Sequence, residues 1–337
     1  MDRKKPLIGL AVGVLLATGI YLTPLAGLGD SGRLCLALTL MTVVFWGFQI
    51  VQPGFSAGLY LALLVVFQVA PVPVIFAPWS GPVMYLVIGA YLIAGAVKSS
   101  GLGERIAYRF ILKFVTSYRS IIISIFALTF ILSLLIPHPW PRAFLIMSVM
   151  SVLIKSTAMP REDAAKVGFA VFAASVPVSM IFLTGDSVIN VLAAQATGKA
   201  ISWVDWFIYM GPPNIVSSLL TCSLILFLFR PGQEIVLNKS DIRQRLAAMG
   251  TLSRLEIRAT LWLALAILLW LTDSIHGIHL GWVTFLVAMG MALPGVGEVL
   301  GPKDWAGVPI QVLLFLTAAI TIGNVGGVTG MKSWIGQ

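Results

Sequence analysis

Apolar segments long enough to cross a membrane alternate with short polar loops along most of the chain. A helix needs about 20 apolar residues to span the hydrocarbon core of a bilayer, and fewer when it packs among other helices. We therefore expect an all-α polytopic membrane protein. The predicted spans are residues 7–28, 33–51, 55–72, 82–97, 167–183, 206–229, 259–271, 280–293 and 308–322.

One stretch, residues 136–142 (Ile-Pro-His-Pro-Trp-Pro-Arg), interrupts this pattern between two apolar arms that are short for full spans. Its prolines cannot continue a helix, because proline lacks the N–H group and fixes φ. We expect residues 120–154 to form a re-entrant hairpin whose tip has an open backbone. Non-helical backbone is tolerated at membrane depth only where it is buried in protein or lines a cavity. The tip is therefore a candidate binding site.

Composition and charge support the membrane class. The 337 residues are 58% hydrophobic and 10% charged, and the mean hydropathy is +0.97, whereas soluble domains carry about 25% charged residues. The net charge is +9, and its cations lie in loops between the spans. They therefore report membrane orientation rather than nucleic-acid binding. We expect the lipid bilayer as a partner and no nucleic acid.

The basic loops indicate the orientation, because positive charge collects on the cytoplasmic side of membrane proteins. With the N-terminus inside, residues 98–119, 155–166 and 230–258 all fall inside if the hairpin returns to its starting side. A single crossing at the hairpin would place the last two segments outside, so the charge pattern excludes it. The charges leave open a re-entrant hairpin or two full spans, and the short arms and proline-rich tip favour re-entry. We expect an inner (plasma) membrane protein with a cytoplasmic N-terminus.

Two pairs of similar segments indicate an internal repeat. Residues 79–89 resemble residues 305–315, and residues 101–106 resemble residues 330–335. In this topology the span after the first segment runs from outside to inside, and its counterpart runs in the opposite direction. Inverted repeats of this kind are typical of secondary transporters.

The repeat suggests a division of the chain into three parts. We assign residues 1–229 to a first membrane repeat that includes the hairpin, residues 230–258 to a cytoplasmic basic linker, and residues 259–337 to an incomplete second repeat. By analogy with the first copy, a full second repeat would need roughly 120 further residues. We therefore expect a truncated chain with an inverted-repeat secondary transporter fold.

Three segments carry recognisable motifs. The first is residues 85–109, with Ala-Tyr-Leu-Ile-Ala-Gly-Ala-Val-Lys-Ser-Ser-Gly-Leu-Gly-Glu-Arg-Ile-Ala; the second is residues 253–293, with Gly-Ile-His-Leu-Gly-Trp-Val, followed by Leu-Pro-Gly-Val-Gly; the third is residues 304–330. Together they resemble the divalent anion:sodium symporter family of dicarboxylate, citrate and sulfate permeases. The resemblance covers nearly the whole chain. It implies a homodimer that carries a small anionic substrate, held with sodium between two hairpin tips bearing Ser-Asn-Thr and two unwound helix stretches.

The sequence departs from the family pattern at these binding motifs. Residues 137–142 stand where the first Ser-Asn-Thr is expected. The glycine-rich stretch of the family falls near residues 174–190, where one alignment has Pro177 and Val178 in place of glycines. The second tip would lie beyond the end of this sequence. These differences indicate a changed substrate or changed ion coupling.

The hairpin tip offers two candidate substrate ligands. Arg142 has a planar fork that suits a carboxylate or sulfate, and a charge within a membrane marks a functional site by default. Alternatively, it snorkels or caps the hairpin. His138 can carry a proton near neutral pH, or it can be a hydrogen-bonded structural residue. Asn190, in the next polar break, completes the candidate substrate set.

That second polar break, residues 184–190, offers the candidate ion ligands Thr184, Gly185, Asp186 and Ser187. Oxygen-bearing side chains and freed carbonyls suit sodium, and Asp186 could take a proton instead. The alternative is an ordinary helix start with Asp186 or Ser187 as the N-cap. We expect Na⁺ or H⁺ as the coupling ion, with no other cofactor and no structural metal.

Together these features predict a secondary active transporter of small dianions such as dicarboxylates or sulfate, coupled to a cation and working by alternating access. The sequence offers no clear nucleophile–base pair, so we expect neither an enzyme nor catalytic residues. The alternative is a non-transporting membrane scaffold or sensor that retains the transporter fold, which the altered binding motifs motivate.

Overall fold

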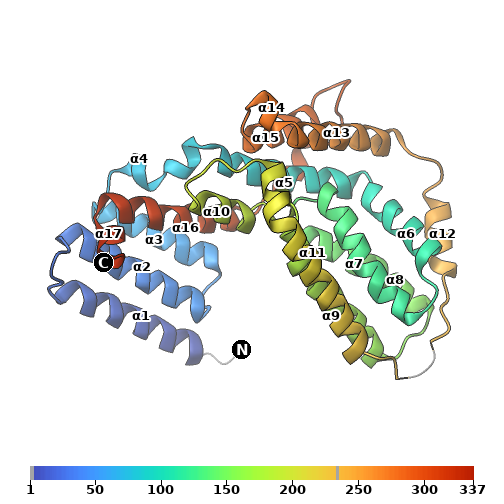
Figure 1. Cartoon of the computed structure of the whole chain (residues 1–337), viewed down its shortest axis with the longest axis horizontal. Helices are drawn as coiled ribbons and strands as arrows, with labels where there is room; N and C mark the ends of the chain where they lie inside the picture. Colours follow the sequence, from blue (N-terminus) through green and yellow to red (C-terminus); the bar gives the residue numbers. More distant parts are fainter. Residues whose placement is uncertain (1–3, 233–234) are drawn as a thin grey trace. The chain divides into compact units, whose positions relative to one another are not determined.

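The computed structural model describes residues 4–232 and 235–337, and the regular elements that it describes are helices (Figure 1). Five of these helices are long and apolar enough to cross a membrane. They are Lys4–Leu22, Pro82–Ser99, Tyr118–Leu135, Trp203–Leu228 and Ile310–Val328. The predicted all-α polytopic membrane class is confirmed. The inverted repeat and the three-part division of the chain stay predictions.

The chain forms two compact units, Met1–Tyr85 with Pro309–Gln337 (unit 1) and Leu86–Val308 (unit 2). Unit 1 contains α1 (Lys4–Leu22), α2 (Asp30–Gly47), α3 (Pro53–Val66), α4 (Val72–Ile75), η1 (Ala77–Ser80), α16 (Ile310–Val328) and α17 (Met331–Ile335). Helix α5 (Pro82–Ser99) belongs mostly to unit 2.

Unit 2 continues with α6 (Leu102–Phe114), α7 (Tyr118–Leu135), α8 (Pro139–Ser156), α9 (Arg161–Ser179), η2 (Leu183–Asp186), α10 (Ile189–Ala196), α11 (Trp203–Leu228), α12 (Ser240–Ala248), α13 (Arg254–Leu271), α14 (Asp273–His276), α15 (Leu280–Gly290) and η3 (Pro302–Gly307).

Close helix packing in unit 1 depends on small residues. A Cβ at Gly13 of α1 would lie 2.6 Å from the Phe45 ring of α2, and a Cβ at Gly54 of α3 would lie 2.5 Å from Cβ of Gln311 on α16. Glycine lets helices approach this closely in a membrane, where close packing replaces the hydrophobic effect as the driving force. These contacts hold α1 against α2 and α3 against α16 (Figure 1).

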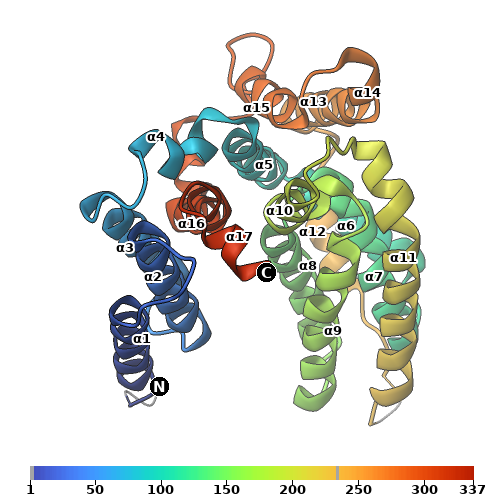
Figure 2. The same cartoon turned by 60° about the vertical axis from the view of Figure 1, so that its left-hand side comes forward.

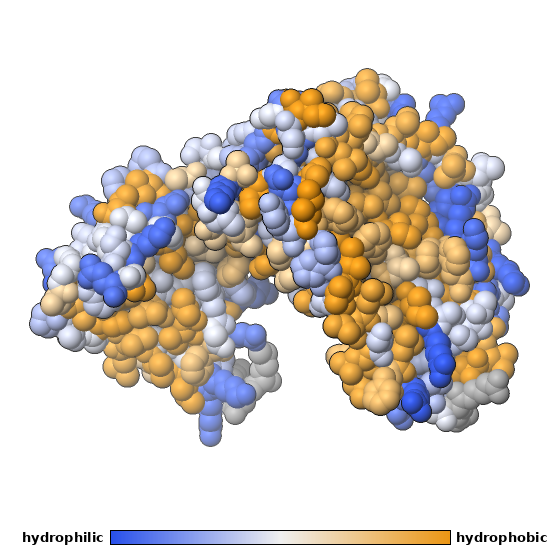
Figure 3. Space-filling view, in the orientation of Figure 1, coloured by the Kyte–Doolittle hydropathy of each residue, from blue (hydrophilic) through white to orange (hydrophobic). Residues whose placement is uncertain are grey.

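In unit 2 the two hairpin arms, α7 and α8, pack together with α9 and α11 (Figure 2). Their outer surfaces remain apolar: Leu219, Leu220 and Phe227 of α11 are each more than 60% exposed. Hydrophobic residues cover much of the visible face of this unit in Figure 3. Such a surface is suited to contact with lipid chains rather than water.

The structure changes three boundaries expected from the sequence. The hairpin arms are longer than expected, since α7 and α8 have 18 residues each. The polar segment at residues 155–166 is only partly a turn, because α9 begins at Arg161. Two acidic residues lie in the first turn of α9, where their negative charge interacts favourably with the helix dipole. The linker at residues 230–258 contains α12, a helix that its weak apolar periodicity did not predict.

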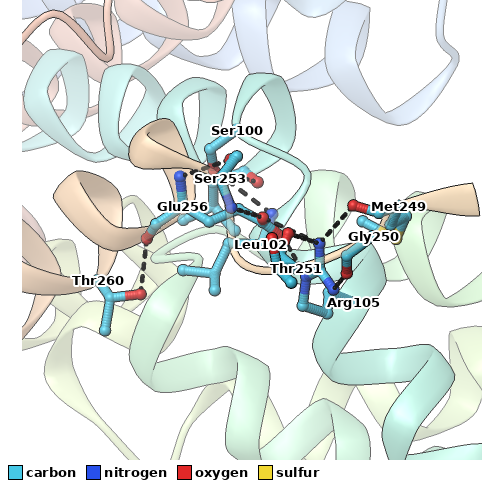
Figure 4. Close-up of polar contacts among 10 residues, drawn as sticks. Ser100, Leu102, Arg105, Met249, Gly250, Thr251, Ser253, Glu256 and Thr260 are labelled. Carbon is cyan, nitrogen blue, oxygen red and sulfur yellow. Dashed lines mark hydrogen bonds and ion pairs between the residues drawn. The ribbon is translucent and has the colours of Figure 1, made fainter. Parts of the chain in front are cut away.

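A buried ion pair anchors the end of this linker to the membrane helices (Figure 4). Arg105 of α6 donates from Nη2 to Oε2 of Glu256 on α13 at 3.0 Å, and it also donates to the main-chain oxygens of Met249, Gly250 and Thr251. Glu256 in turn accepts from the N–H of Ser253 at 2.8 Å and closes a capping box at the start of α13.

Candidate functional site

The hairpin tip opens over three residues only. Helix α7 ends at Leu135, and α8 already begins at Pro139. The imidazole Nδ1 of His138 accepts the N–H of Trp140 at 3.3 Å and caps α8. Proline is tolerated in the first turn of a helix because the N–H groups there have no intrahelical partner. The last two prolines of the tip therefore start α8, and the expected opening narrows to residues 136–138.

The second break separates α9 from α10. Pro177 lies near the end of α9, where it removes one intrahelical hydrogen bond, and the helix ends two residues later at Ser179. The chain then passes through η2 before α10 begins at Ile189. Oδ1 of Asp186 accepts the N–H groups of Val188 and Ile189, both at 3.1 Å. Asp186 thus binds two N–H groups at the start of α10, a contact of the kind that the helix-start alternative expected, although the N-cap residue itself is Val188.

Arg142 joins the two breaks. Its side chain is fully buried, and its Nη1 donates to the carbonyl oxygens of Ile136 at 3.1 Å and Gly185 at 3.3 Å. Its Nη2 donates to Oγ of Ser179 at 2.6 Å. The N–H of Ser187 also donates to the carbonyl of Pro137 at 3.4 Å. The predicted substrate and ion residues therefore meet in one buried cluster.

Two further predicted residues hold the second break in shape. The amide nitrogen of Asn190 donates to the carbonyls of Ser179 at 2.8 Å and Phe182 at 2.9 Å. Gly185 lies so close to the end of α9 that an added Cβ would stand 2.3 Å from the carbonyl oxygen of Ser179. Both residues are buried, so the irregular backbone here has a fixed conformation.

Tryptophans from α11 complete the cluster, and the sequence analysis missed them. Nε1 of Trp203 donates to Oγ1 of Thr184 at 3.1 Å, and Nε1 of Trp206 donates to the carbonyl of Met180 at 3.0 Å. The Trp203 ring stacks on Phe182 with 5.2 Å between ring centroids. Because tryptophan is common at membrane interfaces, its place near a helix end does not by itself indicate a buried role.

His138 has a second partner that was not expected. Its Nε2 lies 2.8 Å from the hydroxyl of Tyr91 on α5, and the two rings pack with centroids 4.5 Å apart. With Nδ1 already accepting from the backbone, the neutral imidazole carries its proton on Nε2 and donates it to the tyrosine oxygen. The His138 side chain is 5% exposed. The hydrogen-bonded structural reading of His138 therefore matches its contacts.

A pocket of about 460 Å³ lies where α8 and α10 begin. Its walls include Trp140, Phe172, Ser175, Ser179, Asp186 and Ile189. Pockets of this size and largely apolar lining are typical of small-molecule sites. Two buried polar atoms of the neighbouring cluster, Nε of Arg142 and Oγ of Ser187, have no hydrogen-bond partner within the described part of the chain.

A helical membrane protein in which a hairpin tip meets a broken helix around a buried charge has the architecture of a secondary transporter. The chain matches the sodium:sulfate symporter transmembrane region over residues 4–337. It therefore belongs to this family of membrane transporters, and the resemblance to divalent anion:sodium symporters is confirmed.

Curated relatives of the chain carry the names of anion transporters. The putative malate transporter YflS of Bacillus subtilis is 24% identical over 347 residues, covering 97% of this chain and 70% of its own length. The sodium-dependent dicarboxylate transporter SdcS of Staphylococcus saprophyticus is 22% identical over 369 residues, covering 100% and 71%. The L-tartrate/succinate antiporter of Escherichia coli is 24% identical over 342 residues, covering 95% and 66%.

Proposed function

We propose that the chain serves as a secondary transporter of small dianions, such as dicarboxylates or sulfate, that works by alternating access. Family membership and the names of the relatives support the substrate class. The observation that carries the proposal for this chain is the junction of hairpin tip and helix break around the buried Arg142. A buried charge in a membrane protein is costly and marks a functional site by default, and a positive one favours anions.

The helix directions at the junction agree with an anionic substrate. Helices α8 and α10 both begin there, at Pro139 and Ile189, and both residues line the pocket. Helix N-termini carry a partial positive charge, which transporters direct at anionic substrate groups. Asp186 accepts the N–H groups of Val188 and Ile189, so its proposed part is to define the start of α10.

The proposed roles of the individual residues follow from their contacts. Arg142 supplies the positive charge beside the pocket, and His138 fixes the start of α8. Asn190 already donates both amide protons to main-chain oxygens, so we propose that it positions the break rather than holding substrate directly. The candidate ion residues Thr184 and Ser187 lie in the same cluster: Oγ1 of Thr184 accepts from Trp203, and Oγ of Ser187 has no partner among the described residues.

The proposed setting is the inner (plasma) membrane with a cytoplasmic N-terminus, in agreement with the positive-inside count of the loops. The family resemblance supports a homodimer and coupling to sodium, with a proton as the alternative ion. The names of the relatives include a sodium-dependent transporter and an antiporter, so the mode of coupling differs among similar chains.

Uptake into proteoliposomes tests the function. The reconstituted protein should accumulate labelled succinate, citrate or sulfate in a saturable manner above empty vesicles, and an excess of the unlabelled anion should compete. Each anion is measured with and without a sodium gradient and a pH gradient. A correctly folded protein that neither binds nor transports any of these anions contradicts the proposal and favours the non-transporting scaffold or sensor.

A further inference from the structure

The guanidinium of Arg142 sits where three oxygen atoms from three separate elements converge. Ile136 follows the last residue of α7, Ser179 is the last residue of α9, and Gly185 lies in η2. All three distances, from 2.6 to 3.3 Å, are those of hydrogen bonds. The side chain is 0% exposed, so protein encloses it on every side.

These oxygens form the kind of site that usually binds a metal cation. Main-chain carbonyl and hydroxyl oxygens are the ligands of hard cations. The C-terminal ends of helices carry a partial negative charge. In broken-helix transporters, freed carbonyls and helix C-terminal ends bind the coupling sodium ion or proton. Here the end of α7 and the η2 turn each provide a carbonyl, the end of α9 provides a hydroxyl, and the side chain of Arg142 occupies the position between them.

The neighbourhood leaves little room for a second positive charge. Among the described residues, Arg142 forms no ion pair with a carboxylate, so main-chain dipoles, one hydroxyl and the longer-range attraction of Asp186 compensate its charge. A sodium ion at this junction would compete for the same oxygens. It would also stand beside a like charge in a medium of low dielectric constant, where repulsion is strong. Sodium, which the family implies, does not fit at this tip.

We propose that Arg142 is a tethered cation that takes the place of the coupling ion at this hairpin, so that anion binding here needs no sodium. The part of this proposal that concerns anion binding rests on the proposed transport function. The part that concerns Arg142 in a cation site does not depend on transport and can be tested by itself.

The test compares the native protein with Arg142→Ser and Arg142→Lys, purified in detergent and heated in NaCl or in choline chloride of equal ionic strength. The native protein and Arg142→Lys should show no sodium-specific change of melting temperature. Arg142→Ser empties the site of its charge and should gain a sodium-specific rise of roughly 2–4 °C. Arg105→Ser, which removes a buried arginine away from the hairpin, serves as the control and should gain none.

A second variant covers the case in which Arg142→Ser does not fold. Arg142→Gln keeps one N–H donor and offers a carbonyl oxygen as a ligand, and it should gain a smaller rise in sodium. The proposal is overturned if sodium specifically raises the melting temperature of the native protein. It is also overturned if sodium fails to raise the melting temperature of every neutral variant that folds. Because NaCl alone is the probe, this result is independent of whether the protein transports succinate or sulfate in the uptake assay.

Discussion

The substitution Gly185→Ala probes the junction with a single methyl group. The new Cβ would lie 2.3 Å from the carbonyl oxygen of Ser179 and 3.1 Å from its carbonyl carbon, and these are backbone atoms that cannot rotate away. The η2 turn must therefore move. The bond from Arg142 to the carbonyl of Gly185 is already 3.3 Å long, so a shift of a few tenths of an ångström breaks it.

The expected cost has two parts. Overpacking costs about 1–3 kcal/mol, and a buried N–H group that loses its acceptor costs about 1–3 kcal/mol. Together they lower the free energy of unfolding by roughly 2–6 kcal/mol and reduce anion binding by at least about tenfold, since each 1.4 kcal/mol is a factor of ten. Gly307→Ala is the matched control, because no atom lies within 4 Å of its added Cβ.

Thermal unfolding in detergent and binding of labelled succinate and sulfate measure the two effects. Gly185→Ala should melt several degrees below the native protein, while Gly307→Ala melts with it. If Gly185→Ala keeps both the native melting temperature and native anion binding, then the break is not rigid, and the bond from Arg142 to the carbonyl of Gly185 does not hold it in shape.

Three further predictions concern buried hydrogen bonds. Arg105→Met should lower the free energy of unfolding by about 3–5 kcal/mol, and Glu256→Gln should lower it by less, because Gln keeps the cap of α13. In thermal unfolding, the double mutant should lose less stability than the two single mutants lose together. The hydrogen bond from Arg105 lowers the pKa of Glu256. The stability that this pair contributes is therefore complete above about pH 4.3 and is lost as the pH falls through the folded-state pKa. Thermal unfolding measured across this pH range should show the loss in the native protein and not in Glu256→Gln. Asn190→Leu should reduce anion binding more than Tyr91→Phe, because it removes two buried hydrogen bonds and leaves the carbonyl of Ser179 without its amide donor, whereas the phenylalanine removes one hydroxyl beside His138. Equal losses in a binding titration would contradict this ranking.

The membrane class and the positions of both breaks could be predicted from the sequence because they depend on local signals. Long apolar segments specify helices in a bilayer whatever they pack against. Pro137 marks the open tip, and Pro177 lies just before the end of α9. The candidate residues from Arg142 to Asn190 were found because polar side chains are conspicuous in apolar segments.

The partners of these residues could not be predicted in the same way. Two of the three acceptors of Arg142 are main-chain carbonyls, which every residue has, so the sequence carries no signal for them. The third, Ser179, lies 37 positions away along the chain. The contact between His138 and Tyr91 likewise joins residues 47 positions apart. Helix α12 escaped prediction because its helical residues are mostly polar and bury only Ile242.

The covalent attachment of Arg142 also affects the electrical state of the carrier. A bound sodium ion can leave with the substrate, and the empty site then returns uncharged. A guanidinium held at the ends of α7 and α9 cannot leave, so in the proposed carrier the empty site would have to cross the membrane barrier with this fixed positive charge and without the substrate anion, which is costly in a medium of low dielectric constant. Return with a second anion in place avoids this cost. If the chain transports anions as proposed, the fixed charge of Arg142 would therefore favour one-for-one exchange of anions over net uptake.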